Sequence, residues 1–135
     1  MFQEIVLVGN LGRDPELRYT PAGTSVCNLS LATNRRWKTA EGADREEVAW
    51  FRISVWGKQG EACNAHLRKG RQVLVKGRLV ADENGNPRIW TGQDGSPRAS
   101  FEVNAETVRF LGSKPQNGDQ AEDHPAETEQ EEIPF

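Results

Sequence analysis

The sequence predicts a small all-β protein that closes its strands into a barrel, with one short helix as its only other regular element. Three features of the 135 residues lead to this expectation. Apolar and polar residues alternate with the period of two that half-buried strands require. Clusters rich in glycine, proline and asparagine separate the alternating runs. About five such runs, with a single helical segment between the third and fourth long ones, favour a small β-barrel.

The first half of the chain supplies three long strands. The apolar run at residues 5–9 forms the first, and the prolines and glycine within 14–23 predict a loop after it. Between 25 and 34 apolar residues fall on alternate positions, which predicts a half-buried strand. A turn at 41–44 leads into the next long strand, at 48–56.

The second half begins with the predicted helix, at residues 59–69, where apolar residues recur at helical spacing until Gly70 stops them. An alternating strand follows at 73–79. We then expect a short strand around 89–90 and a closing strand from 99 to 111, with glycine-containing turns before each of them.

The net charge of −3 divides unevenly along the chain. Residues 1–112 carry 16 Lys and Arg against 13 Asp and Glu, a net charge of +3. Residues 113–135 carry one Lys and seven acids, a net charge of −6, with few apolar side chains. Because such a segment cannot bury enough surface to offset its ordering entropy, we predict a folded domain at 1–112 and a disordered acidic tail at 113–135.

The sequence gives no sign of a membrane protein, a metal site or an enzyme. Its longest aliphatic run, Ile5 to Val8, is far shorter than the roughly 20 residues of a membrane span. The N-terminus lacks the pattern of a signal peptide, so we expect a cytoplasmic protein. Cys27 and Cys63 lie far apart without metal-ligand spacing, so we expect buried thiols, no metal and no cofactor. No phosphate-binding loop or Ser/His/Asp set indicates catalysis.

The strand predicted at 48–56 carries the strongest functional signal. Its odd positions are all apolar and predict the side that faces the core: Ala49, Phe51, Ile53 and Val55. Trp50 and Trp56 share the opposite face, with Arg52 between them. Because the odd positions already supply the core, these indoles are exposed unless a ligand or a partner covers them.

All four tryptophans lie beside cations. Trp37 follows Arg35 and Arg36, and Trp90 comes two residues after Arg88. Unpaired bases stack on aromatic rings with about 1–3 kcal/mol per base, while Lys and Arg neutralise the phosphates between them. The pattern favours binding of single-stranded nucleic acid. It leaves open a subunit interface or an ordinary core as the place of the tryptophans.

A series of short motifs runs through the chain. It comprises IVLVGNLGRDPE at 5–16, LATN at 31–34, WFRI at 50–53, WGK at 56–58, LRKG at 67–70 and VKGRL at 75–79. The acidic C-terminus then ends in Ile133-Pro134-Phe135. In this order the motifs resemble bacterial single-stranded DNA-binding proteins, over about residues 2–112 and the last few residues.

The resemblance implies an OB-fold, which is a five-stranded Greek-key barrel with one short helix. It also implies a homotetramer that wraps single-stranded DNA in replication, recombination and repair and catalyses nothing, and hence a nucleoid-associated protein. Aromatic residues at four matching positions stack on bases in that family: Trp37, Trp50, Trp56 and Trp90. The position of Trp56 is commonly Phe in the family, so this chain offers a larger ring there.

The resemblance also indicates a basic contact to DNA at Lys58. Charge and expected orientation add further candidates for phosphate binding: Arg13, Arg35, Arg36, Arg52, Arg71, Arg78 and Arg88. In the family the acidic tip recruits nucleases, helicases and recombination mediators. The corresponding residues here are Glu131, Glu132, Ile133, Pro134 and Phe135.

The chain departs from the family pattern at other places too. Phe51 stands where many members carry His at a position of subunit contacts, and the segment 82–95 around Trp90 is longer than in the best-known members.

Two other functional classes remain as alternatives. Stacking alone does not separate DNA from RNA, so an RNA-binding OB protein of the cold-shock or tRNA-binding type is one. A protein-interaction module with tryptophans buried between subunits is the other.

Overall fold

A computed structural model of the chain describes residues 1–112. The predicted tail at 113–135, including its tip, lies outside the described residues. The elements in chain order are β1 (Ile5–Leu11), β2 (Glu16–Tyr19), β3 (Ser25–Lys38), β4 (Asp44–Trp56), α1 (Gly57–His66), β5 (Gln72–Leu79), β6 (Ile89–Thr91), β7 (Pro97–Ala99) and β8 (Phe101–Leu111).

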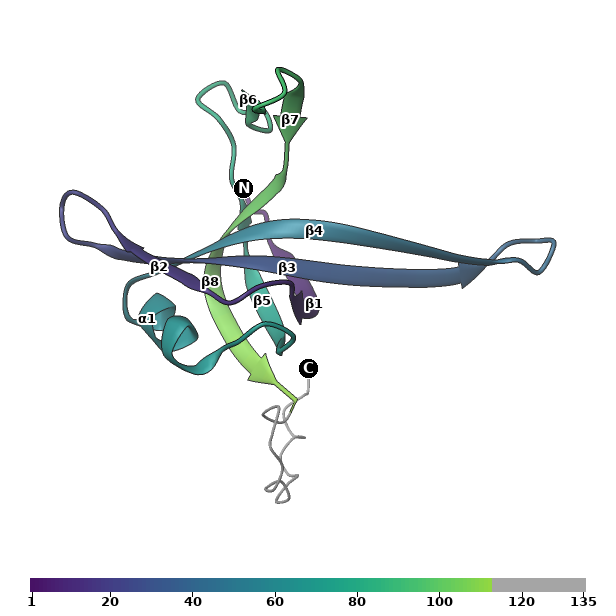
Figure 1. Cartoon of the computed structure of the whole chain (residues 1–135), viewed down its shortest axis with the longest axis horizontal. Coiled ribbons are helices and arrows are strands. Elements are labelled where there is room, and N and C mark those ends of the chain that lie inside the picture. The colour runs from purple at the N-terminus through teal and green to yellow at the C-terminus, as the bar shows by residue number, and fades with distance from the viewer. Residues whose placement is uncertain (113–135) are drawn as a thin grey trace.

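Five of these strands close into a barrel. The main sheet has the order β1-β5-β8-β4-β3-β2, and a further antiparallel pairing of β1 with β3 joins its two sides (Figure 1). All its pairs are antiparallel except β4 with β8, which run parallel. The strand order and the helix between β4 and β5 are those of an OB-fold, as predicted.

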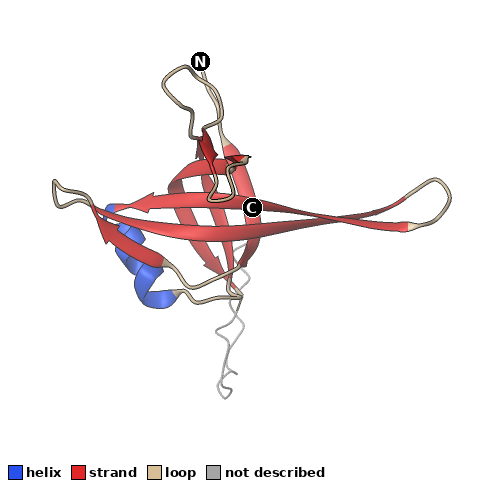
Figure 2. Cartoon of the chain, turned by 45° about the horizontal axis from the view of Figure 1, so that its top comes forward, coloured by secondary structure: helices blue, strands red, loops and turns tan. Residues whose placement is uncertain are grey.

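The core lies inside this barrel and under the helix. The alternation read from the sequence is confirmed, because alternate residues of β3, β4 and β5 are fully enclosed while their neighbours are not. The largest fully buried side chains are Leu31, Ile53, Leu67, Val55, Val73, Val75, Val103, Cys27 and Cys63. Both cysteines are therefore buried free thiols, as expected. Helix α1 packs on β3 and β4 beside β2 (Figure 2).

Two glycines let the strands approach closely enough for closure. A Cβ atom on Gly9 in β1 would lie 2.2 Å from the carbonyl oxygen of Ala32 in β3. A Cβ atom on Gly77 in β5 would lie 2.1 Å from the carbonyl oxygen of Asn104 in β8, next to a shift of the β5–β8 register. No side chain fits at either place without moving backbone, so these glycines are required by the fold.

The prediction of a loop between the first two long strands was wrong, because β2 forms there. It has only four residues, of which Leu17 alone packs against the core, so its period-two signal is too short to recognise. The helix begins at Gly57 and ends at His66, earlier at both ends than predicted. The predicted closing strand is interrupted at Ser100, and its first residue, Ala99, is the last residue of β7.

The β3–β4 hairpin is longer than predicted and extends beyond the barrel. Past the pair Ala32 and Trp50 these two strands pair only with each other, up to Lys38 opposite Asp44. We call residues 33–49 the arm; it projects away from the barrel in Figure 1. The end of the arm is polar and therefore lacks the apolar alternation from which a strand is predicted. Cross-strand ion pairs are found there instead.

Candidate nucleic-acid interface

The outer face of β4 presents two tryptophans, as the sequence predicted. Trp50 is 51% exposed and Trp56 is 46% exposed, while Ile53 and Val55 on the other face are fully buried. Arg52 lies between the two indoles on the same side of the strand. The exposed rings are thus arranged on a rigid strand rather than on a loop.

Trp50 rests on the end of β1. A Cβ atom on Gly12 would lie 2.4 Å from Cζ3 and 2.6 Å from Cη2 of the Trp50 ring. Gly12 is itself fixed, because its N–H donates to the carbonyl oxygen of Ser30 at 2.9 Å. The absence of a side chain at Gly12 therefore makes room for the ring, which keeps half of its surface open to solvent.

Trp56 is oriented by the last strand of the barrel. Its indole N–H donates to Oδ1 of Asn104 in β8 at 3.3 Å. With its polar atom satisfied, the remainder of the ring is an apolar surface available for stacking. Neither Gly12 nor Asn104 was singled out from the sequence, because no local pattern connects a glycine or an asparagine with a tryptophan on another strand.

Trp90 reaches the same face from a separate hairpin. Strands β6 and β7 pair only with each other and stand above the barrel in Figure 1. The guanidinium carbon of Arg52 lies 5.7 Å from the centroid of the Trp90 ring, within the range of a cation–π contact. The longer segment around Trp90 therefore forms a hairpin that brings this ring to β4, and Trp90 stays 37% exposed.

Trp37 is separate from the other three tryptophans. It lies on the arm opposite Arg45, and the strand alternation puts it on the other face of the β3–β4 ribbon from Trp50, whose partner is Ala32. The guanidinium carbon of Arg35 lies 4.4 Å from its ring centroid. Trp37 is 39% exposed, so it presents a second aromatic surface on the arm.

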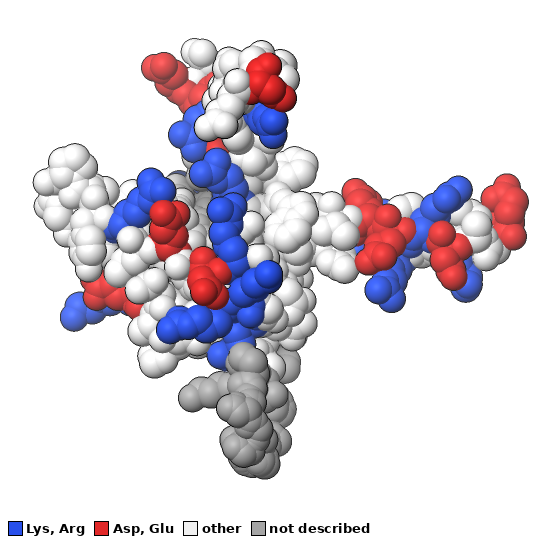
Figure 3. Space-filling view, in the orientation of Figure 1, with Lys and Arg blue, Asp and Glu red and all other residues white. Residues whose placement is uncertain are grey.

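Four of the eight cations predicted to bind phosphate already pair with carboxylates. Arg35 lies 3.2 Å from Glu47, Arg36 lies 3.5 Å from Glu46, and Arg78 lies 4.0 Å from Glu106. Arg88 pairs with Glu102. The pairs on the arm are solvent-exposed and contribute little to stability. Figure 3 shows the resulting alternation of acidic and basic side chains along the arm.

The other four cations make no ion pair with any residue in the described part of the chain. Arg13 follows Gly12, Lys58 lies at the start of α1, and Arg52 lies over the ring of Trp90. Arg71 donates from Nη1 to the carbonyl oxygen of His66 at 3.3 Å. Its pKa is lowered from the usual value because partial burial removes water from the guanidinium. Figure 3 also shows a band of Lys and Arg crossing the front of the barrel.

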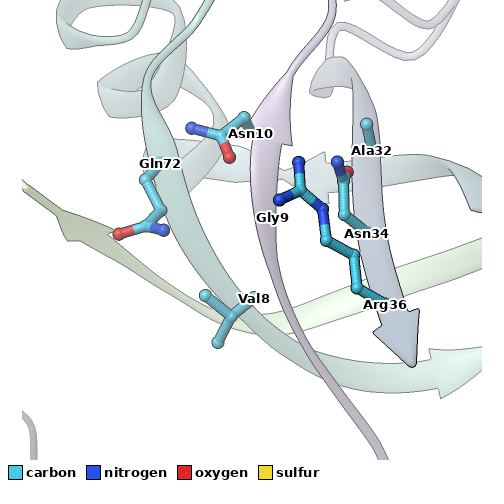
Figure 4. A pocket seen from close by; sticks show the side chains of 7 residues that line it. All are labelled: Val8, Gly9, Asn10, Ala32, Asn34, Arg36 and Gln72. Carbon is cyan, nitrogen blue, oxygen red and sulfur yellow. The ribbon is translucent and has the colours of Figure 1, made fainter. Parts of the chain in front are cut away.

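A shallow pocket lies beside β1 on the outer surface of the barrel. Its polar lining comes from Asn10, Asn34, Arg36 and Gln72, and Val8 lies at its apolar side (Figure 4). Val8 is 47% exposed and its neighbour on the same face, Val6, is 54% exposed.

Among residues 1–112 no group of His, Cys, Asp and Glu could hold a metal ion. No helix in that part of the chain is long and apolar enough to cross a membrane.

Comparison with known proteins gives a consistent result. A sequence model described as the single-strand binding protein family matches residues 2–111. A single-stranded DNA-binding protein of Wolinella succinogenes is 39% identical over 126 residues, which are 92% of this chain and 74% of that protein. The protein of the same name from Helicobacter hepaticus is 38% identical over 89% of this chain and 66% of its own length. That of Xanthomonas campestris pv. campestris is 40% identical over 82% of this chain and 61% of its own.

A solved structure is also similar to this chain. It is described as a Plasmodium falciparum SSB complex with ssDNA, and it matches with a TM-score of 0.69 and 27% sequence identity. The match covers 83% of this chain and 97% of the other. The chain thus spans between 61% and 74% of the length of the three bacterial relatives, and nearly the whole of this structural relative.

Proposed function

Because the chain belongs to the single-strand binding protein family, we propose that it binds single-stranded DNA without sequence preference and wraps and protects it. Members of this family bind DNA and are not enzymes. The observation that carries the proposal is the outer face of β4, where Trp50 and Trp56 are exposed on both sides of Arg52 and Trp90 meets that arginine.

The chemistry of this face suits unpaired bases. Each exposed indole offers a flat apolar surface to a base, whatever its identity, with about 1–3 kcal/mol per stacked base. Bases of a duplex are already stacked on each other and show only their edges in the grooves. We propose Trp50, Trp56 and Trp90 as one stacking surface and Trp37 on the arm as another, which the strand reaches as it passes the barrel.

The cations that we propose to contact phosphates differ in whether a carboxylate pairs with them in the free protein. Arg13, Arg52, Lys58 and Arg71 make no ion pair with a described residue, so they are the first candidates. A phosphate must displace a carboxylate from Arg35, Arg36 and Arg78. Each phosphate neutralised changes the slope of log affinity against log salt by about −0.7. The carboxylate partner of Arg88 is more enclosed than the partners of these three arginines.

Substitution of the tryptophans tests this function. Trp50→Ala and Trp56→Ala are each expected to weaken oligo-dT binding by about 5- to 150-fold, the equivalent of about 1–3 kcal/mol. Phe2→Ala removes another exposed aromatic ring and serves as the control. Quenching of tryptophan fluorescence gives the affinity. Unchanged oligo-dT affinity in both variants would contradict the proposed stacking surface. Affinity for oligo-U equal to that for oligo-dT would favour the RNA-binding alternative.

We also propose that the chain assembles as a homotetramer. The exposed Val6 and Val8 on the outer face of β1, with Leu74 paired opposite Val8, support this because such apolar residues gain by contact with a second copy. The amide-lined pocket beside Val8 supplies hydrogen-bonding groups at the same surface. Light scattering measures the mass, and Val8→Asp is expected to lower it. A wild-type chain that scatters as a monomer contradicts the proposal.

The acidic tail remains a proposal from the sequence. We propose that residues 1–112 form the DNA-binding and assembly domain, and that Glu131, Glu132, Ile133, Pro134 and Phe135 recruit replication, recombination and repair proteins such as nucleases, helicases and recombination mediators. A cytoplasmic, nucleoid-associated location follows from this role. Deletion of Phe135 is expected to abolish capture of such proteins while oligo-dT affinity is retained; capture that survives the deletion contradicts the assignment of the tip.

A further inference from the structure

The β6–β7 hairpin needs an external support to keep its position. Each of its strands has three residues, and they pair only with each other. Its turn is ordered locally, because the carboxylate of Asp94 accepts hydrogen bonds from the N–H and the hydroxyl of Ser96. An isolated two-stranded hairpin is marginally stable in water. The position of Trp90 therefore depends on what fastens the hairpin to the barrel.

The pair of Arg88 and Glu102 lies where such a support is required. Arg88 directly precedes β6, and Glu102 follows shortly after β7, on β8. The two side chains are joined by an ion pair, and the hydroxyl of Ser100 donates to the other carboxylate oxygen at 3.4 Å. Glu102 is also the strand partner of Arg52, the residue that Trp90 contacts.

This ion pair differs from those on the arm in the burial of its acid. The side chain of Glu102 is 10% exposed, whereas that of Glu47 in the pair with Arg35 is 58% exposed. A carboxylate that has lost most of its water is costly to leave without a cation, so Arg88 is held in place. An exposed pair such as Arg35 and Glu47 exchanges freely with solvent ions.

We propose that Glu102 is a positioning residue for single-stranded DNA binding. Its ion pair with Arg88 fastens the β6–β7 hairpin to the barrel, which holds Trp90 against Arg52 as part of the stacking surface. Arg88 is occupied by this pair and neutralises no phosphate, in contrast to what its charge suggested in the sequence. The effect on DNA rests on the proposed function, but the fastening of the hairpin is a property of the free protein.

The test uses a variant that removes the ion pair without changing the net charge, Arg88→Gln with Glu102→Gln. Its matched control is Arg35→Gln with Glu47→Gln, which removes an exposed pair from the arm in the same way. Both proteins are labelled with 5-fluorotryptophan, and the fluorine resonance of Trp90 is assigned with Trp90→Phe. We expect the Trp90 resonance to shift or broaden in the first variant and to stay in place in the control. An unchanged resonance in the first variant overturns the proposal, whether or not the protein binds DNA.

Affinity for oligo-dT supplies the second readout. The charge-neutral variant is expected to lose binding by up to the same factor as Trp90→Ala, about 5- to 150-fold if one stacked base is lost. When Trp90→Ala is added to it, we expect no further loss, because the pair acts through that ring. Losses that multiply in the combined protein contradict a positioning role.

The salt dependence separates positioning from direct contact. Arg88→Gln alone is expected to keep the wild-type slope of log affinity against log salt, whereas Arg52→Gln reduces its magnitude by about 0.7. A reduction of that size in Arg88→Gln shows that Arg88 binds a phosphate and overturns the proposal. Arg88→Lys, which keeps the charge and the reach, is expected to restore the Trp90 resonance. If wild-type protein fails to bind oligo-dT, the proposed function fails while the fluorine measurement still decides whether the hairpin is fastened.

Discussion

Replacement of Gly12 by alanine should impair DNA binding without weakening the fold. The backbone of Gly12 does not have a positive φ, so alanine fits its conformation. The three heavy atoms nearest to the added methyl group all belong to the ring of Trp50, with Cζ3 at 2.4 Å and Cη2 at 2.6 Å. The perturbation is therefore confined to one side chain of the proposed stacking surface.

The size of the displacement follows from these distances. Carbon atoms in contact are about 3.5–4.0 Å apart, so the ring has to move by about 1 Å or more. The binding free energy that is lost when the ring is displaced cannot exceed the whole stacking contribution of Trp50, about 1–3 kcal/mol. We expect a loss of oligo-dT affinity within that range, and a free energy of unfolding that is unchanged or raised by about 0.4–1 kcal/mol, as is usual for Gly→Ala at a compatible site.

The assay is a fluorescence titration with oligo-dT, combined with urea denaturation. The same substitution in a Trp50→Ala background is the control, since no ring is left there to displace. If Gly12→Ala lowers affinity equally in both backgrounds, the contact between the ring and Gly12 is not the cause. If it leaves affinity unchanged while the free energy of unfolding falls, the reasoning about the ring is refuted.

Three further outcomes are expected. Gly77→Ala forces a methyl group against the carbonyl oxygen of Asn104 at 2.1 Å and should lower the free energy of unfolding by about 3 kcal/mol or more, seen as an early thermal transition; a normal transition would contradict the close approach. Burial, with a smaller effect of Cys27, raises the pKa of the Cys63 thiol from 9.0 to about 12. Since the unfolded chain releases this proton first, stability should be unaffected below pH 9 and fall between pH 9 and 12, and Cys63→Ala should flatten that fall in urea titrations. Arg36→Gln should change the salt slope of oligo-dT binding less than the 0.7 or so expected for an unpaired arginine, because Glu46 already neutralises it; an equal change would mean that DNA displaces the carboxylate completely.

The barrel and the exposure of Trp50 and Trp56 on one face of β4 could be predicted because period-two alternation is a local property of a strand. Ile53 and Trp50 belong to one strand, so their opposite orientations follow from their positions alone, and the structure confirms them. The ends of the elements depended on partners instead. The pairing of β3 with β4 continues to Lys38 through polar residues that give no period-two signal, and β2 forms where β3 offers an edge to pair with.

The supports of the aromatic rings could not be predicted, because they join segments far apart in the sequence. Nothing local to Gly12 shows that the ring of Trp50 will lie on it, and nothing local to Asn104 shows that it will accept a hydrogen bond from Trp56. In the same way, Arg88 looked like a free cation until the barrel brought Glu102 beside it. Charge counted along a sequence does not reveal which charges are already neutralised.

The parallel pairing of β4 with β8 has a consequence for synthesis of the protein. Phe51 pairs with Phe101, so the second edge of β4 stays open until a strand more than a third of the chain further along has been synthesised. The groups that fix Trp56 and Arg88, Asn104 and Glu102, are also on this last strand. Pairings between strands that are distant in the sequence form late in folding. During synthesis, β4 and β8 can pair only after both strands have left the ribosome. A nascent or truncated chain that lacks β8 therefore carries all four tryptophans but lacks the assembled surface that we propose binds DNA.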